Sequence, residues 1–192
     1  GRPSMYAVDE AAFVDNAETV EKALSGNTDC VGWLSSVNGM GNLFARKRHT
    51  TRAMVDVNQV IRETLALRSY EQRLSNITII DALASGLPQV FADPHQMQQV
   101  LLNLVINAEQ AMIGSHGRGT LILRTWHDPD RNAVILEVND DGPGVPEDVQ
   151  PKIFDPFFTT KEVGKGTGLG LTVAYAIVQE HGGHIRVDSQ PG

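Results

Sequence analysis

The chain has 192 residues, a single cysteine and a formal net charge of −7 at pH 7. One cysteine excludes an intramolecular disulfide and favours a reducing compartment, and the acidic balance argues against a nucleic-acid-binding surface. No apolar run approaches the roughly 20 residues that a membrane helix needs, and no signal peptide is recognisable. We therefore expect a cytoplasmic domain that does not itself contact a membrane. This expectation is compatible with a membrane anchor elsewhere in the parent protein.

The first 52 residues are expected to be helical and separate from the rest, residues 53–192. Residues 9–25 are rich in alanine and glutamate, and the apolar residues between 33 and 44 keep helical spacing up to a basic run at 46–49. Two helices with a short break suggest an antiparallel pair. Three glycines in the second of these segments weaken the helix prediction there.

Residues 53–192 alternate between helix and strand patterns. Asp56 is an expected N-cap for a helix that runs to about Leu74. The further elements expected in chain order are a strand at 77–80, a turn at 86–88, a helix at 93–112, strands at 120–126 and 133–139, a helix at 171–181 and a strand at 184–189. This order predicts an α/β sandwich, with helices packed on one face of a mixed sheet.

The helix at 93–112 carries two stripes. Asp93 and Pro94 are typical of a helix start, and apolar residues then recur at the spacing of a buried face. A second, polar stripe consists of Gln96, Gln99, Asn103, Asn107 and Gln110. Asparagine is a poor helix former, so two of them one turn apart indicate either a binding function or simply the solvent-exposed face of an amphipathic helix.

Three glycine-containing or aromatic motifs follow this helix in a fixed order. They are NDDGPGV at 139–145, FDPFFTTK at 154–161 and GKGTGLGL at 164–171. Each alone is a weak signal. Together with the asparagines they resemble the N box, first glycine box, F box and second glycine box of the ATP-binding catalytic domain of sensor histidine kinases, in the GHKL superfamily. The short segment between the last two motifs is most similar to the nitrogen-regulator type of kinase.

The resemblance covers roughly residues 56–192 and implies a GHKL-type two-layer sandwich that binds ATP and Mg²⁺. By resemblance, LFARKR at 43–48 is the end of a dimerisation hairpin. No histidine precedes His49, so the phosphoacceptor histidine is expected outside this chain. The family continues past the last residues into a final core strand, whose absence would leave an open sheet edge.

The resemblance makes Asn107 the ligand of the Mg·ATP complex and places Asn103 near the phosphates. Mg²⁺ prefers oxygen ligands and keeps most of its water. Hydrolytic members of the superfamily carry a glutamate base where Asn103 stands, and an amide cannot act as a general base near neutral pH. Transfer of the phosphoryl group, rather than hydrolysis, is therefore expected; local hydrogen bonding is the alternative role for Asn103.

The first glycine box is expected to bind adenine. Asp140 would accept a hydrogen bond from the adenine amino group, while Gly142 and Gly144 let the backbone approach the base. Asp141 ranks below Asp140, and a plain surface turn is the alternative for the whole motif.

The second glycine box is expected to bind phosphate at a helix start. Gly166, Gly168 and Gly170 precede the helix, with backbone amides from Thr167 and Leu169. Lys161 and Lys165 are candidate phosphate cations or, alternatively, solvated lid lysines. Many histidine kinases carry a phosphate-binding lysine where this chain has Gln110. Lys161 and Lys165 are therefore expected to supply the positive charge that binds phosphate here. The phenylalanines of the F box are expected to anchor the lid, with core packing as the alternative for Phe154.

These features predict a histidine protein kinase fragment that transfers the γ-phosphoryl group of Mg·ATP to a histidine on a dimerisation hairpin. The expected partners are that hairpin and the receiver domain of a response regulator, with a homodimer in the full-length protein. The alternatives are a nucleotide-gated interaction module without transfer activity and an anti-sigma-factor-like serine kinase.

Overall fold

The computed structural model describes residues 4–9, 51–161 and 166–190. Residues 4–9 form a strand that is paired on both sides, which differs from the helical segment expected for residues 1–52. The helices expected within 9–25 and 33–44, and the candidate Lys165, lie outside the described residues.

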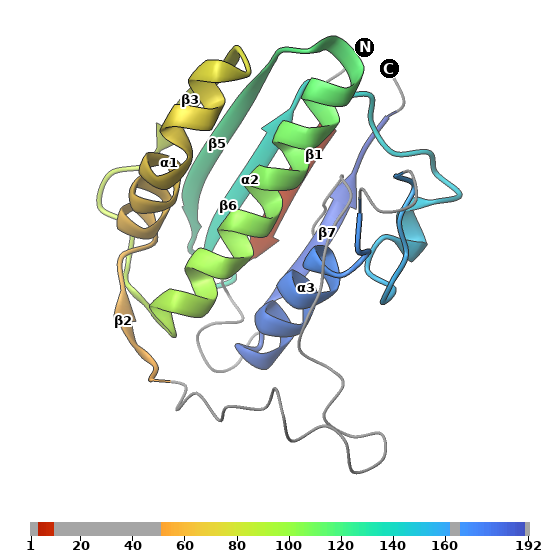
Figure 1. Cartoon of the computed structure of the whole chain (residues 1–192). Helices are drawn as coiled ribbons and strands as arrows, with labels where there is room; N and C mark the ends of the chain where they lie inside the picture. The colour runs from red at the N-terminus through yellow and green to blue at the C-terminus, as the bar shows by residue number, and fades with distance from the viewer. Residues whose placement is uncertain (1–3, 10–50, 162–165, 191–192) are drawn as a thin grey trace.

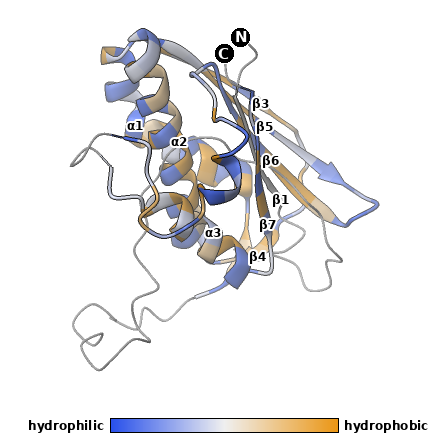
Figure 2. Ribbon diagram, turned by 90° about the vertical axis from the view of Figure 1, so that its right-hand side faces the viewer, coloured by the Kyte–Doolittle hydropathy of each residue, from blue (hydrophilic) through white to orange (hydrophobic). Residues whose placement is uncertain are grey.

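The described residues form two layers, a sheet with three helices on one of its faces (Figures 1 and 2). The five-stranded sheet has the order β3-β5-β6-β1-β7, and β2 and β4 form a separate antiparallel pair. Only β3 and β5 pair in parallel, so the sheet is mixed. The bounds are β1 Ser4–Asp9, β2 Ala53–Val55, α1 Val57–Leu74, β3 Ile77–Leu83, β4 Val90–Ala92, α2 Pro94–His116, β5 Gly119–Asp128, β6 Ala133–Asp140, α3 Gly170–Glu180 and β7 His184–Asp188. The predicted fold class is confirmed.

The place between β6 and β7 is filled by β1, the strand nearest the N-terminus (Figure 1). Its register pairs Ser4 with Asp140 of β6 and Met5 with Asp188 of β7. This segment, which sequence patterning did not identify as a strand, therefore lies inside the sheet and connects β6 to β7.

Helix α2 lies across the middle of the sheet and supplies the centre of the core. Asp93 caps it as predicted, because its Oδ1 accepts hydrogen bonds from the N–H groups of His95 and Gln96. Leu104, Val105 and other apolar residues of the stripe are fully buried. The helix ends one turn later than expected, at His116, where Gly117 adopts a left-handed conformation with φ of 68°.

Helices α1 and α2 are joined by a polar cluster around Glu109, whose side chain is buried. Arg68 Nη2 donates to Glu109 Oε2 at 2.6 Å, and Gln72 Nε2 donates to Oε1 at 2.8 Å. The hydrogen bond to Glu109 raises the pKa of Arg68, which keeps the guanidinium charged. Because both carboxylate oxygens are satisfied, Glu109 is tolerated inside the helix layer.

His181 ties the end of α3 to the start of α2. Its Nε2 accepts a hydrogen bond from the N–H of Asp93 at 3.1 Å, and its Nδ1 lies 2.9 Å from the carbonyl oxygen of Ile177. This arrangement requires a neutral ring with the proton on Nδ1. Burial lowers the pKa of His181 below its usual 6.5, and the charge of Arg52 lowers it further, against opposing effects of Ile177, Glu180 and Asp93.

Acidification should therefore destabilise the fold through His181. Above pH 6.5 the imidazole is neutral in both the folded and the unfolded chain. Below pH 6.5 the unfolded chain binds a proton at His181 that the folded chain does not yet bind. The free energy of unfolding therefore falls by at most about 1.4 kcal/mol per pH unit as the pH decreases. Urea unfolding at pH 7.5, 6.5 and 5.5 measures this slope. His181→Gln keeps an acceptor for Asp93 and should show a shallower slope; an unchanged slope would contradict the assignment.

Candidate functional site

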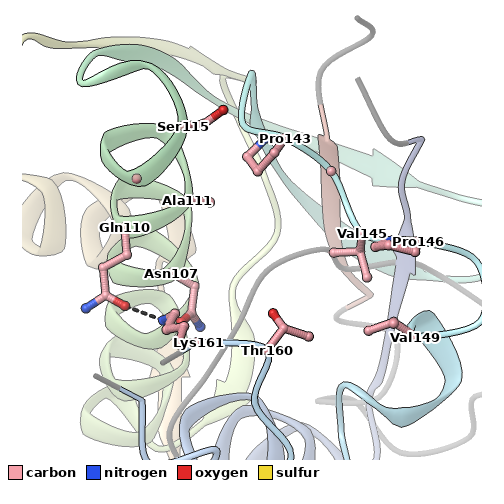
Figure 3. A pocket seen from close by; sticks show the side chains of 12 residues that line it. Asn107, Gln110, Ala111, Ser115, Pro143, Val145, Pro146, Val149, Thr160 and Lys161 are labelled. Atoms are coloured by element: carbon pink, nitrogen blue, oxygen red, sulfur yellow. Dashed lines mark hydrogen bonds between the residues drawn. The ribbon is translucent and has the colours of Figure 1, made fainter. Parts of the chain in front are cut away.

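A cavity of about 380 Å³ opens between α2 and the loop that follows β6 (Figure 3). One wall is α2, the opposite wall is the loop at 143–149, and Thr160 and Lys161, the last two residues of the phenylalanine motif, form a third side. The lining residues are Asn107, Gln110, Ala111, Gly114, Ser115, Pro143, Gly144, Val145, Pro146, Val149, Thr160 and Lys161. The cavity thus combines an apolar wall with a polar edge, as small-molecule sites commonly do.

The two asparagines of α2 have different surroundings. Asn107 is only 4% exposed and contributes to the cavity wall. Asn103 is outside the lining set, and its Nδ2 donates to the carbonyl oxygen of Gly170 at 3.1 Å. Asn103 therefore links α2 to the first turn of α3 through a hydrogen bond between residues 67 positions apart in the sequence.

The loop after β6 is shaped by Asp140, which is 1% exposed at the end of this central strand. Its Oδ1 accepts a hydrogen bond from the N–H of Gly142 at 2.9 Å. A Cβ atom at Gly142 would lie 2.6 Å from that oxygen and 3.2 Å from the Cβ of Ala111, so a side chain does not fit there. Gly144 lines the cavity with φ of 73°, a conformation that favours glycine.

Asp141 belongs to a different surface. Its Oδ1 accepts a hydrogen bond from the N–H of Thr120 at 2.8 Å, and it lines a separate polar cavity with His116 and Arg118. This placement agrees with its lower rank in the sequence analysis.

The phenylalanine motif and the second glycine motif are joined by their backbones. The N–H of Phe157 donates to the carbonyl oxygen of Gly168 at 2.7 Å, and both residues have φ of 65°. A Cβ atom at Gly168 would lie 2.3 Å from the carbonyl carbon of Phe157. Phe157 is 60% exposed and serves as a backbone partner, while Phe154 and Phe158 pack against the core. Phe154 also contacts the ring of Tyr175, with centroids 5.3 Å apart.

The remaining residues of the second glycine motif surround the start of α3. Gly170 is the buried first residue of the helix, Leu169 precedes it and packs on the core, and Thr167 is exposed. Gly166 lies close to the stem of Lys161. The helix start therefore presents its backbone between the Phe157 segment and α2.

Residues 92–192 match the family model described as "Histidine kinase-, DNA gyrase B-, and HSP90-like ATPase". The chain belongs to this family. The match extends from the start of α2 through β7 and includes every segment that surrounds the cavity.

Relatives within this ATPase family include sensor kinases. The chain is 40% identical over 149 residues to the signal transduction histidine-protein kinase AtoS of Escherichia coli (strain K12), covering 78% of this chain and 24% of AtoS. It is 34% identical over 193 residues to the sensory histidine kinase/phosphatase NtrB of Rhizobium leguminosarum bv. phaseoli, covering 94% of this chain and 49% of NtrB. The chain thus spans half or less of these relatives, and its resemblance to nitrogen-regulator-type kinases is confirmed.

The fold of this ATPase-family member is also similar to that of histidine kinase ThkA in its crystal structure with the response regulator protein TrrA. The TM-score is 0.57 at 27% identity, covering 73% of this chain and 41% of ThkA. Among the residues that the model describes, no helix is long and apolar enough to cross a membrane.

The ATPase-family motifs converge only in part on the cavity. Three of the predicted site residues line the cavity: Asn107, Gly144 and Lys161. Asp140 and Gly142 shape the loop that forms one of its walls. Asn103, Gly168 and Gly170 make the contacts that hold the start of α3. Sequence reasoning missed the apolar wall, which consists of Pro143, Val145, Pro146 and Val149. The proline-rich sequence after Asp141 was the available signal.

Proposed function

We propose that this chain is the catalytic ATP-binding part of a sensor histidine kinase and transfers the γ-phosphoryl group of Mg·ATP to a histidine nitrogen on a dimerisation hairpin. The observation that carries the proposal is the convergence of Asn107, Gly144 and Lys161, from three separate motifs, on one cavity. Residues 53–192 form the catalytic domain in this proposal. Membership of the ATPase family supports a nucleotide as the occupant.

Asp140 is the proposed selector for adenine. Its buried carboxylate already orders the loop through Gly142, and a carboxylate accepts a hydrogen bond from the amino group that adenine has and guanine lacks at the same ring position. Gly142 and Gly144 leave the backbone bare where the base would lie, and the apolar wall around Val145 offers the ring a surface to pack on.

The residues fit a Mg²⁺ ion that is held mainly by phosphate. Asn107 contributes an uncharged side-chain oxygen at the polar edge of the cavity. No group of three or more His, Cys, Asp or Glu within the described ranges is arranged to hold a metal. A Mg²⁺ ion held there would supply positive charge to offset the negative charge on the phosphates during transfer.

The start of α3 is the proposed phosphate site. Free N–H groups at a helix N-terminus attract anions, and the backbone of Thr167, Gly168 and Leu169 leads into that turn. Asn103 holds the turn against α2 through Gly170. Its amide cannot take a proton from water, so ATP would be retained for transfer to histidine rather than hydrolysed.

The proposed partners are a dimerisation hairpin that carries the phosphoacceptor histidine and the receiver domain of a response regulator, and the parent protein is proposed to be a homodimer. The similarity to ThkA, whose structure includes a response regulator, supports this class of partner.

The activity is tested by mixing the chain with a separately made hairpin that carries the phosphoacceptor histidine, together with γ-labelled ATP and Mg²⁺. Acid-labile, base-stable label on the hairpin is the expected result, and the same mixture without the chain is the control. Rapid release of labelled phosphate with an unlabelled hairpin would instead place the chain in the hydrolytic branch of its family.

Asp140→Asn should weaken ATP binding by about 1.5–3 kcal/mol, the contribution of a hydrogen bond to a charged group. Calorimetry with ATP and GTP measures both affinity and base selectivity. We expect the unmodified chain to prefer ATP and the variant to lose most of that preference. Asp141 is the neighbouring carboxylate on the other surface, so Asp141→Asn should leave the preference for ATP unchanged. Equal affinity of the unmodified chain for ATP and GTP would contradict the role of Asp140.

A further inference from the structure

Lys161 is held at its backbone and at the end of its side chain. Its backbone N–H donates to Thr159 Oγ1 at 3.1 Å. Its stem passes close to Gly166, where a Cβ atom would lie 3.1 Å from Lys161 Cδ and 2.7 Å from Thr159 Oγ1. Its Nζ donates a hydrogen bond to Gln110 Oε1 on α2. The lysine thus reaches from the F-box segment to the helix that carries Asn107.

The amine end of this lysine is bonded to Gln110 at the edge of the cavity that Asn107 also lines (Figure 3). Gln110 is exposed and follows Asn107 by three residues, so the two lie on neighbouring positions of one helix face. Glutamine accepts a hydrogen bond through its carbonyl oxygen without neutralising the ammonium charge. The contact therefore fixes a full positive charge on α2 one helical turn from the proposed Mg²⁺ ligand, at the same cavity.

We propose that Gln110 is a positioning residue that holds the Lys161 ammonium where it binds the phosphate chain of the nucleotide. This inference rests on the proposed function. In this arrangement the cation comes from the end of the F-box segment, and α2 supplies only its uncharged anchor. Gly166 is required because a side chain there would displace the lysine stem.

Because one residue of this contact supplies an amine and the other an amide, the two side chains can be exchanged between positions 110 and 161. Lys161→Gln removes the charge, and Gln110→Ala removes only the anchor. The double variant Gln110→Lys/Lys161→Gln places the amine on α2 and the amide on the F-box segment, across the same gap. Gln99→Ala is the matched control, since Gln99 is an exposed glutamine of α2 outside the cavity lining.

Calorimetry with ATP and with adenosine, both in excess Mg²⁺, separates phosphate binding from adenine binding. Lys161→Gln and Gln110→Ala should each weaken ATP binding about tenfold or more, the size of one charge-assisted hydrogen bond, and leave adenosine affinity unchanged. The exchanged pair should recover most of the lost ATP affinity, and Gln99→Ala should behave as the unmodified chain. The salt dependence of ATP binding should fall in both single variants.

Unchanged ATP affinity in Gln110→Ala would overturn the positioning role, as would failure of the exchanged pair to recover affinity. Equal losses for ATP and adenosine would show that the contact is merely structural. An unmodified chain that binds adenosine as tightly as ATP would overturn the inference and leave the adenine site intact. An unmodified chain that binds neither would overturn the proposed function, and this inference with it.

Discussion

Gly168→Ala should abolish ATP binding and lower the free energy of unfolding by about 2–5 kcal/mol, combining left-handed backbone strain with overpacking. The added Cβ would lie 2.3 Å from the carbonyl carbon and 2.6 Å from the carbonyl oxygen of Phe157. Both are backbone atoms, so no side chain can rotate away to relieve the collision. The hydrogen bond that joins the F box to the second glycine box would break, and the start of α3 would lose its shape. Thermal melting and calorimetry measure the two effects.

Gly86→Ala is the matched control for this variant. Gly86 has φ of 72°, but a Cβ atom there would meet nothing within 4 Å. It should therefore suffer only the strain of the left-handed conformation, about 1–2 kcal/mol, and bind ATP normally. If Gly168→Ala bound ATP as tightly as Gly86→Ala, the backbone contact with Phe157 would have no part in the site.

Asn107→Ala should remove the Mg²⁺ dependence of ATP binding. We expect a loss of at least about 1.5–3 kcal/mol in the presence of Mg²⁺, comparable to a hydrogen bond to a charged group, and little further loss in EDTA. The apolar stripe of α2 stays intact, so the fold should survive. Calorimetry with and without Mg²⁺, accompanied by circular dichroism, provides the measurement.

Asn103→Ala distinguishes a metal ligand from a structural asparagine on the same helix. It removes the hydrogen bond to Gly170, so it should lower stability and weaken ATP binding equally with and without Mg²⁺. Identical behaviour of the two variants would contradict the assignment of Asn107 as the Mg²⁺ ligand.

Local chemistry explains what the sequence predicted well. The cap at Asp93, the apolar stripe of α2 and the glycines before α3 are determined by neighbouring residues, and the structure places them as expected. The motifs also contain three residues that line the cavity, Asn107, Gly144 and Lys161, because backbone turns and helix starts have strong sequence preferences.

Long-range partners could not be predicted in the same way. Glu109 looked like any polar helix residue, and only the arrangement of α1 beside α2 reveals that Arg68 and Gln72 satisfy it. The contact between Gln110 and Lys161 joins residues 51 positions apart. The pairing of β1 with β6 and β7 likewise depends on tertiary structure, since a six-residue strand carries little information about its neighbours.

The outermost position of β3 has a consequence for the solubility of this protein. An edge strand offers unpaired backbone groups to other molecules, and the run Ile77-Thr78-Ile79-Ile80 has the β-branched composition that favours intermolecular pairing. Ile80 is 46% exposed on this edge. Asp81 follows at once, also exposed, and a second molecule stacking edge to edge in register would bring two such carboxylates together. The charge at Asp81 therefore protects the strand from aggregation on a side where no other described strand pairs with it.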